Sequence, residues 1–186
     1  MLIDSHCHLD FPKLAKDPEV VARARAAGVS GFLTICTRLD KFEGVRAAAA
    51  KADDIWCTVG VHPHEASGSP QADVARLTAL ADDPKVVGFG ETGLDFYYDH
   101  SPRDAQAENF TVHIKAAQAT GLPIVIHTRD ADEKTDAMLR AAMAEKPFTG
   151  VLHCFSSGEA LARTALELGL YISISGIVTF KTAEAL

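Results

Sequence analysis

Short apolar runs alternate with longer amphipathic segments along the whole chain. The apolar runs predict strands, and they lie at residues 2–8, 31–36, 55–62, 85–91, 122–128, 148–155 and 170–176. The segments between them predict helices, including an alanine-rich stretch at 41–52 and longer stretches at 105–120 and 132–145. Because strands and helices alternate one by one, we expect a parallel sheet with right-handed crossovers.

Two parallel architectures fit this alternation. An open doubly wound sheet is possible, but the first strand is not followed by the glycine fingerprint of that fold. A TIM-type (β/α)8 barrel fits better, although the pattern contains about seven strand–helix units, so the eighth unit is missing. No linker interrupts the units, and we therefore expect residues 1–186 to form a single, incomplete barrel domain.

Composition narrows the class of protein. The 186 residues are 47% hydrophobic and carry a formal net charge of −7, which argues against nucleic-acid binding driven by overall charge. A local basic patch is still compatible with a nucleic-acid enzyme. No apolar run approaches a membrane span, and no basic segment precedes an apolar one at the start. The four cysteines form no Cys-x-x-Cys pair, so we expect free thiols in a reducing, cytoplasmic setting.

Side chains of the metal-ligand type cluster by position. They lie at or near the ends of five predicted strands: His6, His8, His62, Glu91, His127 and His153. His6 and His8 are two residues apart and point to the same face of a strand. The carboxyl ends of parallel strands meet at one mouth of a barrel, where active sites lie. His100 and His113 fall outside this set, in a predicted loop and a predicted helix.

The number of candidates favours a two-metal site. Any one histidine alone is more readily explained as a core or rim residue than as a ligand. Imidazole suits zinc, nickel, cobalt or iron, and carboxylate oxygens also suit magnesium and manganese. Five ligands exceed the need of one tetrahedral site that keeps a position open. A pair of ions about 3.5–4 Å apart, bridged by Glu91, would use all of them.

These residues lie in motifs that resemble the TatD-type metal-dependent hydrolases, the TatD-related deoxyribonucleases of the amidohydrolase-like superfamily. The matching stretches span nearly the whole chain in order: DSHCHLD at the start, GVHPH at 60–64, GETGLDFYYD at 90–99, LPIVIHTRDA at 122–131, GVLHCFSSG at 150–158 and YISISGIVTFK at 171–181.

The resemblance implies a role for each position. His6 and His8 would ligate a first metal, His127 and His153 a second, and Glu91 would bridge both as the catalytic carboxylate. The ions would be two divalent metals, among Mg, Mn, Zn or Ni. At the rim, substrate phosphate would be contacted by His62, His64 and Arg129. The simpler alternative for Arg129 is a rim salt bridge with Asp130 or Asp95.

One departure from the family pattern concerns the last unit. In that family an eighth strand ends in Glu-Thr-Asp-x-Pro, whose aspartate ligates the first metal, and no such stretch follows the GIVTFK segment. We therefore expect a family member that lacks its last strand and helix. Strands one and seven would then be unpaired edges, and the chain as written would be inactive or weakly active.

The function implied is hydrolysis of phosphodiester bonds in DNA, as an exonuclease acting on single strands or 3′ ends. The intact enzyme is expected to be a monomer without a membrane partner. An amidohydrolase or esterase, such as an aminoacyl-tRNA deacylase, is the enzymatic alternative. Many such sites bridge their metals with a modified lysine, whereas here Lys85 lies at the far end of the strand that carries Glu91. An inactive metal-binding fragment is the non-enzymatic alternative.

Overall fold

The computed structural model describes residues 2–68, 71–184 and 186. Its centre is one seven-stranded sheet with the strand order β1-β2-β3-β4-β5-β6-β7, all neighbours parallel. The strands are β1 Leu2–Cys7, β2 Val29–Thr34, β3 Ile55–Val59, β4 Val86–Asp95, β5 Ile124–Arg129, β6 Gly150–Leu152 and β7 Tyr171–Ile172. Each of the seven predicted strands is present, so the expected parallel α/β fold is confirmed.

Helices connect successive strands. They are α1 Pro12–Ala15, α2 Val20–Ala26, α3 Phe42–Ala49, α4 Val74–Leu80, α5 Arg103–Thr120, α6 Asp132–Glu145 and α7 Glu159–Glu167, with short 3-10 turns η1 Leu39–Lys41, η2 Pro63–Glu65 and η3 Gly176–Thr179. The longest helix, α5, ends at Gly121, which adopts a left-handed conformation with φ of +80°. Its N–H caps the carbonyl of Ala117, which explains why the helix ends there.

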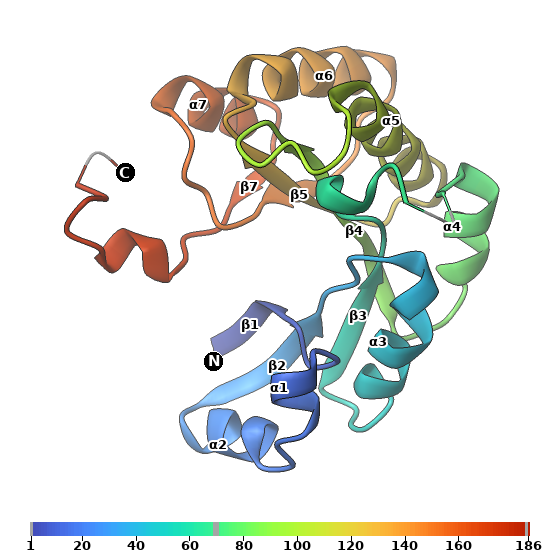
Figure 1. Ribbon diagram of the computed structural model, residues 1–186, viewed down its shortest axis with the longest axis vertical. Coiled ribbons are helices and arrows are strands. Elements are labelled where there is room, and N and C mark those ends of the chain that lie inside the picture. The colour runs from blue at the N-terminus through green and yellow to red at the C-terminus, as the bar shows by residue number, and fades with distance from the viewer. Residues whose placement is uncertain (1, 69–70, 185) are drawn as a thin grey trace.

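The sheet curls as its strands follow one another, and the helices lie along its outer side (Figure 1). This arrangement is a TIM-like half-barrel of seven strands, as the alternation predicts. Within the described residues, β1 and β7 each have a single strand neighbour and form the two edges of the sheet. None of the described helices combines the length and the apolar character that crossing a bilayer requires.

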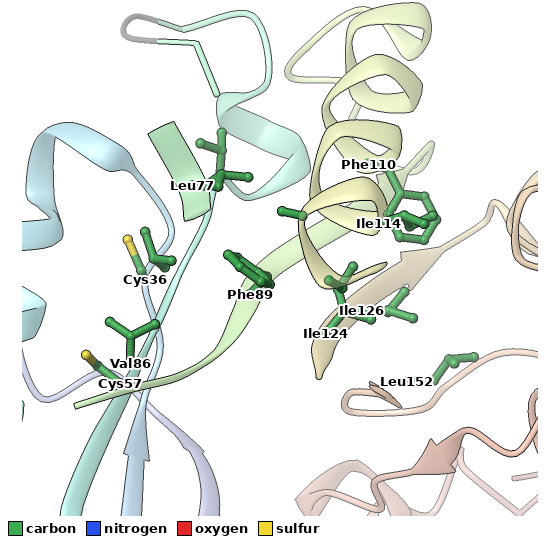
Figure 2. Close-up of a cluster of buried hydrophobic side chains, with 14 of the residues drawn as sticks. Cys36, Cys57, Leu77, Val86, Phe89, Phe110, Ile114, Ile124, Ile126 and Leu152 are labelled. Atoms are coloured by element: carbon green, nitrogen blue, oxygen red, sulfur yellow. The ribbon is translucent and has the colours of Figure 1, made fainter. Parts of the chain in front are cut away.

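The core lies between the outer side of the sheet and the helices. Figure 2 shows Phe89, Ile124 and Ile126 of the sheet beside Phe110 and Ile114 of α5. These five side chains are at most 3% exposed, and burying one large apolar side chain is worth about 1.5–3 kcal/mol. The cluster fixes α5 against β4 and β5, the two strands that supply the middle of the site.

The cysteines are all free, as predicted. Cys36 and Cys57 are completely buried in the core, and burial raises the pKa of the Cys57 thiol to about 12. Cys7 and Cys154 are half-buried. The core thiols therefore act as small apolar side chains.

Helix α5 also holds the segment that follows β3. The N–H of Val61 donates to Nε2 of His113 (3.1 Å), and its carbonyl accepts from Nδ2 of Asn109 (2.8 Å). His113 in turn donates from Nδ1 to the Asn109 carbonyl (2.7 Å). His113 is completely buried, and this burial lowers its pKa to about 4, so the ring is neutral. Both polar groups of Val61 are thus fixed immediately before His62.

The buried neutral ring predicts a loss of stability in acid. In the unfolded chain a histidine titrates near pH 6.5, so between that pH and about 4 the unfolded state binds more protons, and stability falls as pH falls. We expect His113 to remove about 2 kcal/mol of unfolding free energy between pH 7 and pH 5.

Urea unfolding of the wild type and of His113→Gln at both pH values measures this contribution. The variant lacks the titrating ring and should lose correspondingly less stability over the interval. Equal losses in the two proteins would contradict the assignment.

Candidate metal centre

Glu91 lies at the centre of the predicted site. The residue is 4% exposed, and its two carboxylate oxygens face imidazoles from other strands. Nδ1 of His127 lies 3.0 Å from Oε1, and Nε2 of His6 lies 3.2 Å from Oε2. Nε2 of His62 and Nε2 of His153 are 3.5 and 3.6 Å from Oε1. These imidazoles come from the carboxyl ends of β1, β3, β5 and β6, so the predicted convergence of strand ends is observed.

Two glycines allow the close approach of β3 and β4 beneath this carboxylate. Gly90 has a φ of +121°, which a residue with a side chain rarely adopts. A Cβ on Gly60 would lie 2.6 Å from the Gly90 Cα, so only glycine fits at this contact. The pairing of β4 with β5 also shifts between Phe89 and Thr92. The backbone therefore departs from regular strand geometry at the position that carries Glu91.

Glu91 is ionised. Burial opposes its charge, but hydrogen bonds from His127, His6 and His62 outweigh that cost and hold the pKa of the carboxyl well below its usual range. Burial lowers the pKa of His153 to about 4, so this ring is neutral. For His127, the same desolvation is outweighed by Glu91 and Asp95, and its pKa is raised.

Two groups of side chains place their donor atoms within 4.8 Å of one another. The first, His6, His8 and Glu91, is the trio expected around the first metal. The second contains His62, Glu91 and His127, with His62 in the place where the sequence predicts His153. The ring of His153 instead stacks on that of His6, with 3.4 Å between centroids. All six residues line one cavity of about 330 Å³.

Hydrogen bonds to the backbone distinguish the histidines chemically. Nδ1 of His8 lies 3.2 Å from the carbonyl of Ile35, an acceptor, so Nδ1 carries the proton and the Nε2 lone pair is free for a metal. Nδ1 of His62 accepts from the His64 N–H at 3.2 Å, so the proton of a neutral His62 is on Nε2, which faces Glu91. In this protonation state His62 is a hydrogen-bond donor toward Glu91.

Asp95 is a site residue that the sequence considered only as a partner of Arg129. It is completely buried at the end of β4, and its Oδ2 lies 2.8 Å from Nε2 of His64 and 3.0 Å from Nε2 of His127. Its Oδ1 accepts from the N–H groups of Tyr97 and Tyr98 (3.1 and 2.9 Å). A carboxylate behind a metal-facing histidine fixes the orientation of the ring. The signal in the sequence is its spacing of four residues from Glu91, which places both on one face of the strand.

One further observation indicates that these side chains suit a metal ion. Nδ1 of His6 is buried without a hydrogen-bond partner among the described residues. A buried polar nitrogen of this kind costs free energy unless an additional partner is supplied. His6, the free Nε2 of His8 and the shared carboxylate of Glu91 offer nitrogen and oxygen donors suited to a divalent transition metal.

Arg129, at the end of β5, lines the same cavity. The predicted alternative of a salt bridge with Asp95 or Asp130 is wrong, because Asp95 binds two histidines and no ion pair of Arg129 occurs within the described residues. Its guanidinium lies over the rings of Tyr97 and Tyr98, 4.1 and 4.7 Å from their centroids. The charge of Arg129 is therefore not neutralised by a carboxylate.

Lys85 lies away from the site, as the sequence predicts. Its Nζ donates to the carbonyls of Ala52 (2.7 Å) and Ile55 (3.1 Å), at the opposite end of the sheet. It is not placed to bridge two ions beside Glu91. His100 and His113, the two histidines left out of the predicted site, lie in an exposed loop and in α5, outside both groups of donors.

Comparison with known proteins gives a consistent result. The family model of the TatD-related DNases matches residues 3–186. The chain is 41% identical over 192 residues to the uncharacterized metal-dependent hydrolase YcfH of Escherichia coli K12, covering 100% of this chain and 70% of that protein. It is 42% identical over 160 residues to a protein of Cronobacter turicensis named 3′-5′ ssDNA/RNA exonuclease TatD, covering 86% of this chain and 60% of the relative.

A solved structure agrees with these sequences. The crystal structure of YJJV, a TatD homologue from Escherichia coli K12, superposes with a TM-score of 0.88 at 29% identity. The superposition covers 98% of this chain and 71% of that one. Sequence, fold and the convergent His and Glu donors thus agree, and the chain belongs to the TatD-related DNase family of metal-dependent hydrolases.

Proposed function

We propose that this hydrolase cleaves phosphodiester bonds of nucleic acid, as an exonuclease on single-stranded DNA or 3′ ends. The observation that carries the proposal is the buried, ionised Glu91 among four imidazoles in a cavity that also contains Arg129. A guanidinium without a carboxylate partner matches a phosphate in two-pronged fashion. The name of the Cronobacter relative, an exonuclease on single-stranded DNA and RNA, supports the same class of substrate.

Two divalent ions would be held by the predicted set. His6 and His8 would hold one, His127 and His153 would hold the other, and both would share Glu91. His127 can bind through Nδ1 while Nε2 donates to Asp95, an arrangement common for metal-bound histidines. When bound, the ions supply positive charge that stabilises phosphoryl oxygens and acidifies the attacking water. Mg, Mn, Zn and Ni all remain candidates.

The other polar side chains bind and orient the phosphate. His62 and Arg129 both line the cavity, and His62 carries its Nε2–H beside Glu91. His64 is fixed by Asp95 through Nε2, and burial keeps the pKa of its ring below the ordinary value, so it is neutral at pH 7. His62 and Arg129 would hold the non-bridging oxygens in place for in-line attack.

Parallel substrate assays test the proposal. The chain is incubated with each of the four metals and with end-labelled single-stranded DNA, duplex DNA, RNA and aminoacyl-tRNA. We expect slow, metal-dependent release of nucleotides from single strands and no release in EDTA. Hydrolysis of the aminoacyl ester without cleavage of any phosphodiester would instead support the esterase alternative.

Replacement of Glu91 by glutamine is expected to abolish metal-dependent hydrolysis. The neutral amide keeps the shape of the side chain but removes the charge shared by the two donor groups, so turnover should fall at least about 100-fold. Bound metal, measured by inductively coupled plasma mass spectrometry, should fall in parallel. Glu43→Gln on α3, at a highly exposed carboxylate, is the matched control. Wild-type turnover and metal content in the Glu91 variant, with the fold intact by circular dichroism, would refute the assigned role.

Asp95→Asn should weaken metal binding while the turn at the end of β4 is retained. The asparagine Oδ1 can still accept from the N–H groups of Tyr97 and Tyr98, whereas its NH₂ group cannot accept from His64 and His127. Loss of such an orienting carboxylate typically costs about 10–100-fold in metal affinity. Isothermal titration calorimetry with zinc measures the effect.

Asp99→Asn is the control for this measurement, because Asp99 lies four residues further along and pairs with the exposed Arg103 instead of a histidine of the site. Equal zinc affinities of the Asp95 and Asp99 variants would show that Asp95 does not support the centre.

A further inference from the structure

A larger cavity adjoins the metal centre. Its volume is about 930 Å³, and it shares Arg129, Ser156 and Ile177 with the cavity of about 330 Å³ that contains Glu91. The larger cavity is therefore within reach of a substrate held at the centre. None of the predicted metal ligands lines it.

Flat rings and guanidinium groups lie together on its walls. Arg129 lies 4.1 Å from the ring centroid of Tyr97, and Arg103 lies 4.3 Å from that of Phe96. Tyr97 is 57% exposed and Phe180 is 62% exposed, so much of each ring is open to solvent. Large exposed aromatic side chains beside an active site are typical of surfaces on which nucleobases stack.

The charges on the walls favour a nucleic-acid ligand that is recognised by the faces of its bases more than by its phosphates. Arg103 is paired with Asp99 (3.0 Å), and Asp132 accepts from the N–H of Gly158 (2.8 Å). Asp132 keeps its charge in that bond, so the remaining charged groups on the walls are two cations, Arg129 and Lys134, and three acids, Asp130, Asp132 and Glu133. A surface without an excess of cations does not match the dense charge of a duplex, whose base faces are also hidden.

We propose that this cavity, here called the aromatic groove and defined by Phe96, Tyr97, Arg103, Arg129, Ser156 and Phe180, binds the bases of a single nucleic-acid strand. The placement of the scissile phosphodiester beside Glu91 rests on the proposed function. Bases stack on Tyr97 and Phe180, and Arg129 lies between the groove and the centre, where it contacts the phosphate. Stacking accepts every base, so binding depends little on sequence.

Binding without turnover provides the test. Fluorescence anisotropy with a fluorescein-labelled ten-nucleotide strand is measured in EDTA, so that no cleavage occurs. Tyr97→Ala is expected to raise the Kd about tenfold, and Tyr97→Phe, which keeps the ring, to leave it within about twofold. Phe180→Ala is a second groove variant and should also weaken binding. Tyr171→Ala removes an exposed tyrosine from β7, outside the groove, and should bind like the wild type.

Three results would contradict the proposal for the aromatic groove. The Kd could be unchanged in both Tyr97→Ala and Phe180→Ala, the wild type could bind a duplex as tightly as the single strand, or the wild type could show no measurable binding.

A second assay distinguishes a failure of the groove proposal from a failure of the proposed function. It measures hydrolysis of bis(p-nitrophenyl) phosphate by the wild type, a reaction that needs no base stacking. If the wild type hydrolyses the diester and the groove variants bind the strand as tightly as the wild type, the proposal for the groove is refuted and the proposed function stands. If the variants bind the strand more weakly but neither the diester nor the strand is cleaved with any of the metals, the groove is supported and the proposed function is refuted.

Discussion

One buried negative charge determines how the carboxyl ends of the strands are arranged. Removing an ionised carboxylate from water costs several kcal/mol unless it is paired and hydrogen-bonded. Glu91 is 4% exposed and still ionised, so its partners must converge on it. They come from β1, β3, β5 and β6, and each strand end has to reach within about 3–4 Å of the same group. The position of Glu91 thus couples strands that are distant in the sequence.

A second buried carboxylate makes this arrangement rigid. Asp95 binds His127 from the side opposite Glu91, so that ring is held at both nitrogens. It also binds His64 and the backbone of the following turn. From below, His113 and Asn109 of α5 fix the peptide that precedes His62. The imidazoles are therefore oriented by groups that do not themselves face the cavity, which reduces the reorganisation needed when a ligand binds.

The sequence predicts the strands and the main donors because both depend on simple regularities. Apolar runs mark parallel strands, and the ends of such strands meet, so His6, Glu91 and His127 could be placed together. The role of Asp95 was missed because the strand was predicted to end at Glu91, whereas β4 continues to Asp95. The proton position on His62 depends on a backbone N–H in the turn that follows it, which no residue pattern encodes.

The curl of the sheet brings the histidines of its first and later strands together at the candidate metal centre. His6 lies on β1 and His153 follows β6, five positions apart in the strand order, yet their rings stack at 3.4 Å. In a flat sheet, with roughly 4.8 Å between neighbouring strands, the two would be roughly 24 Å apart. The stacked pair therefore exists only because the sheet is closed far enough to face its own first strand. Metal binding and the curvature of the sheet are consequently linked, since any ligand that joins these histidines through Glu91 favours the curled state over a flatter one.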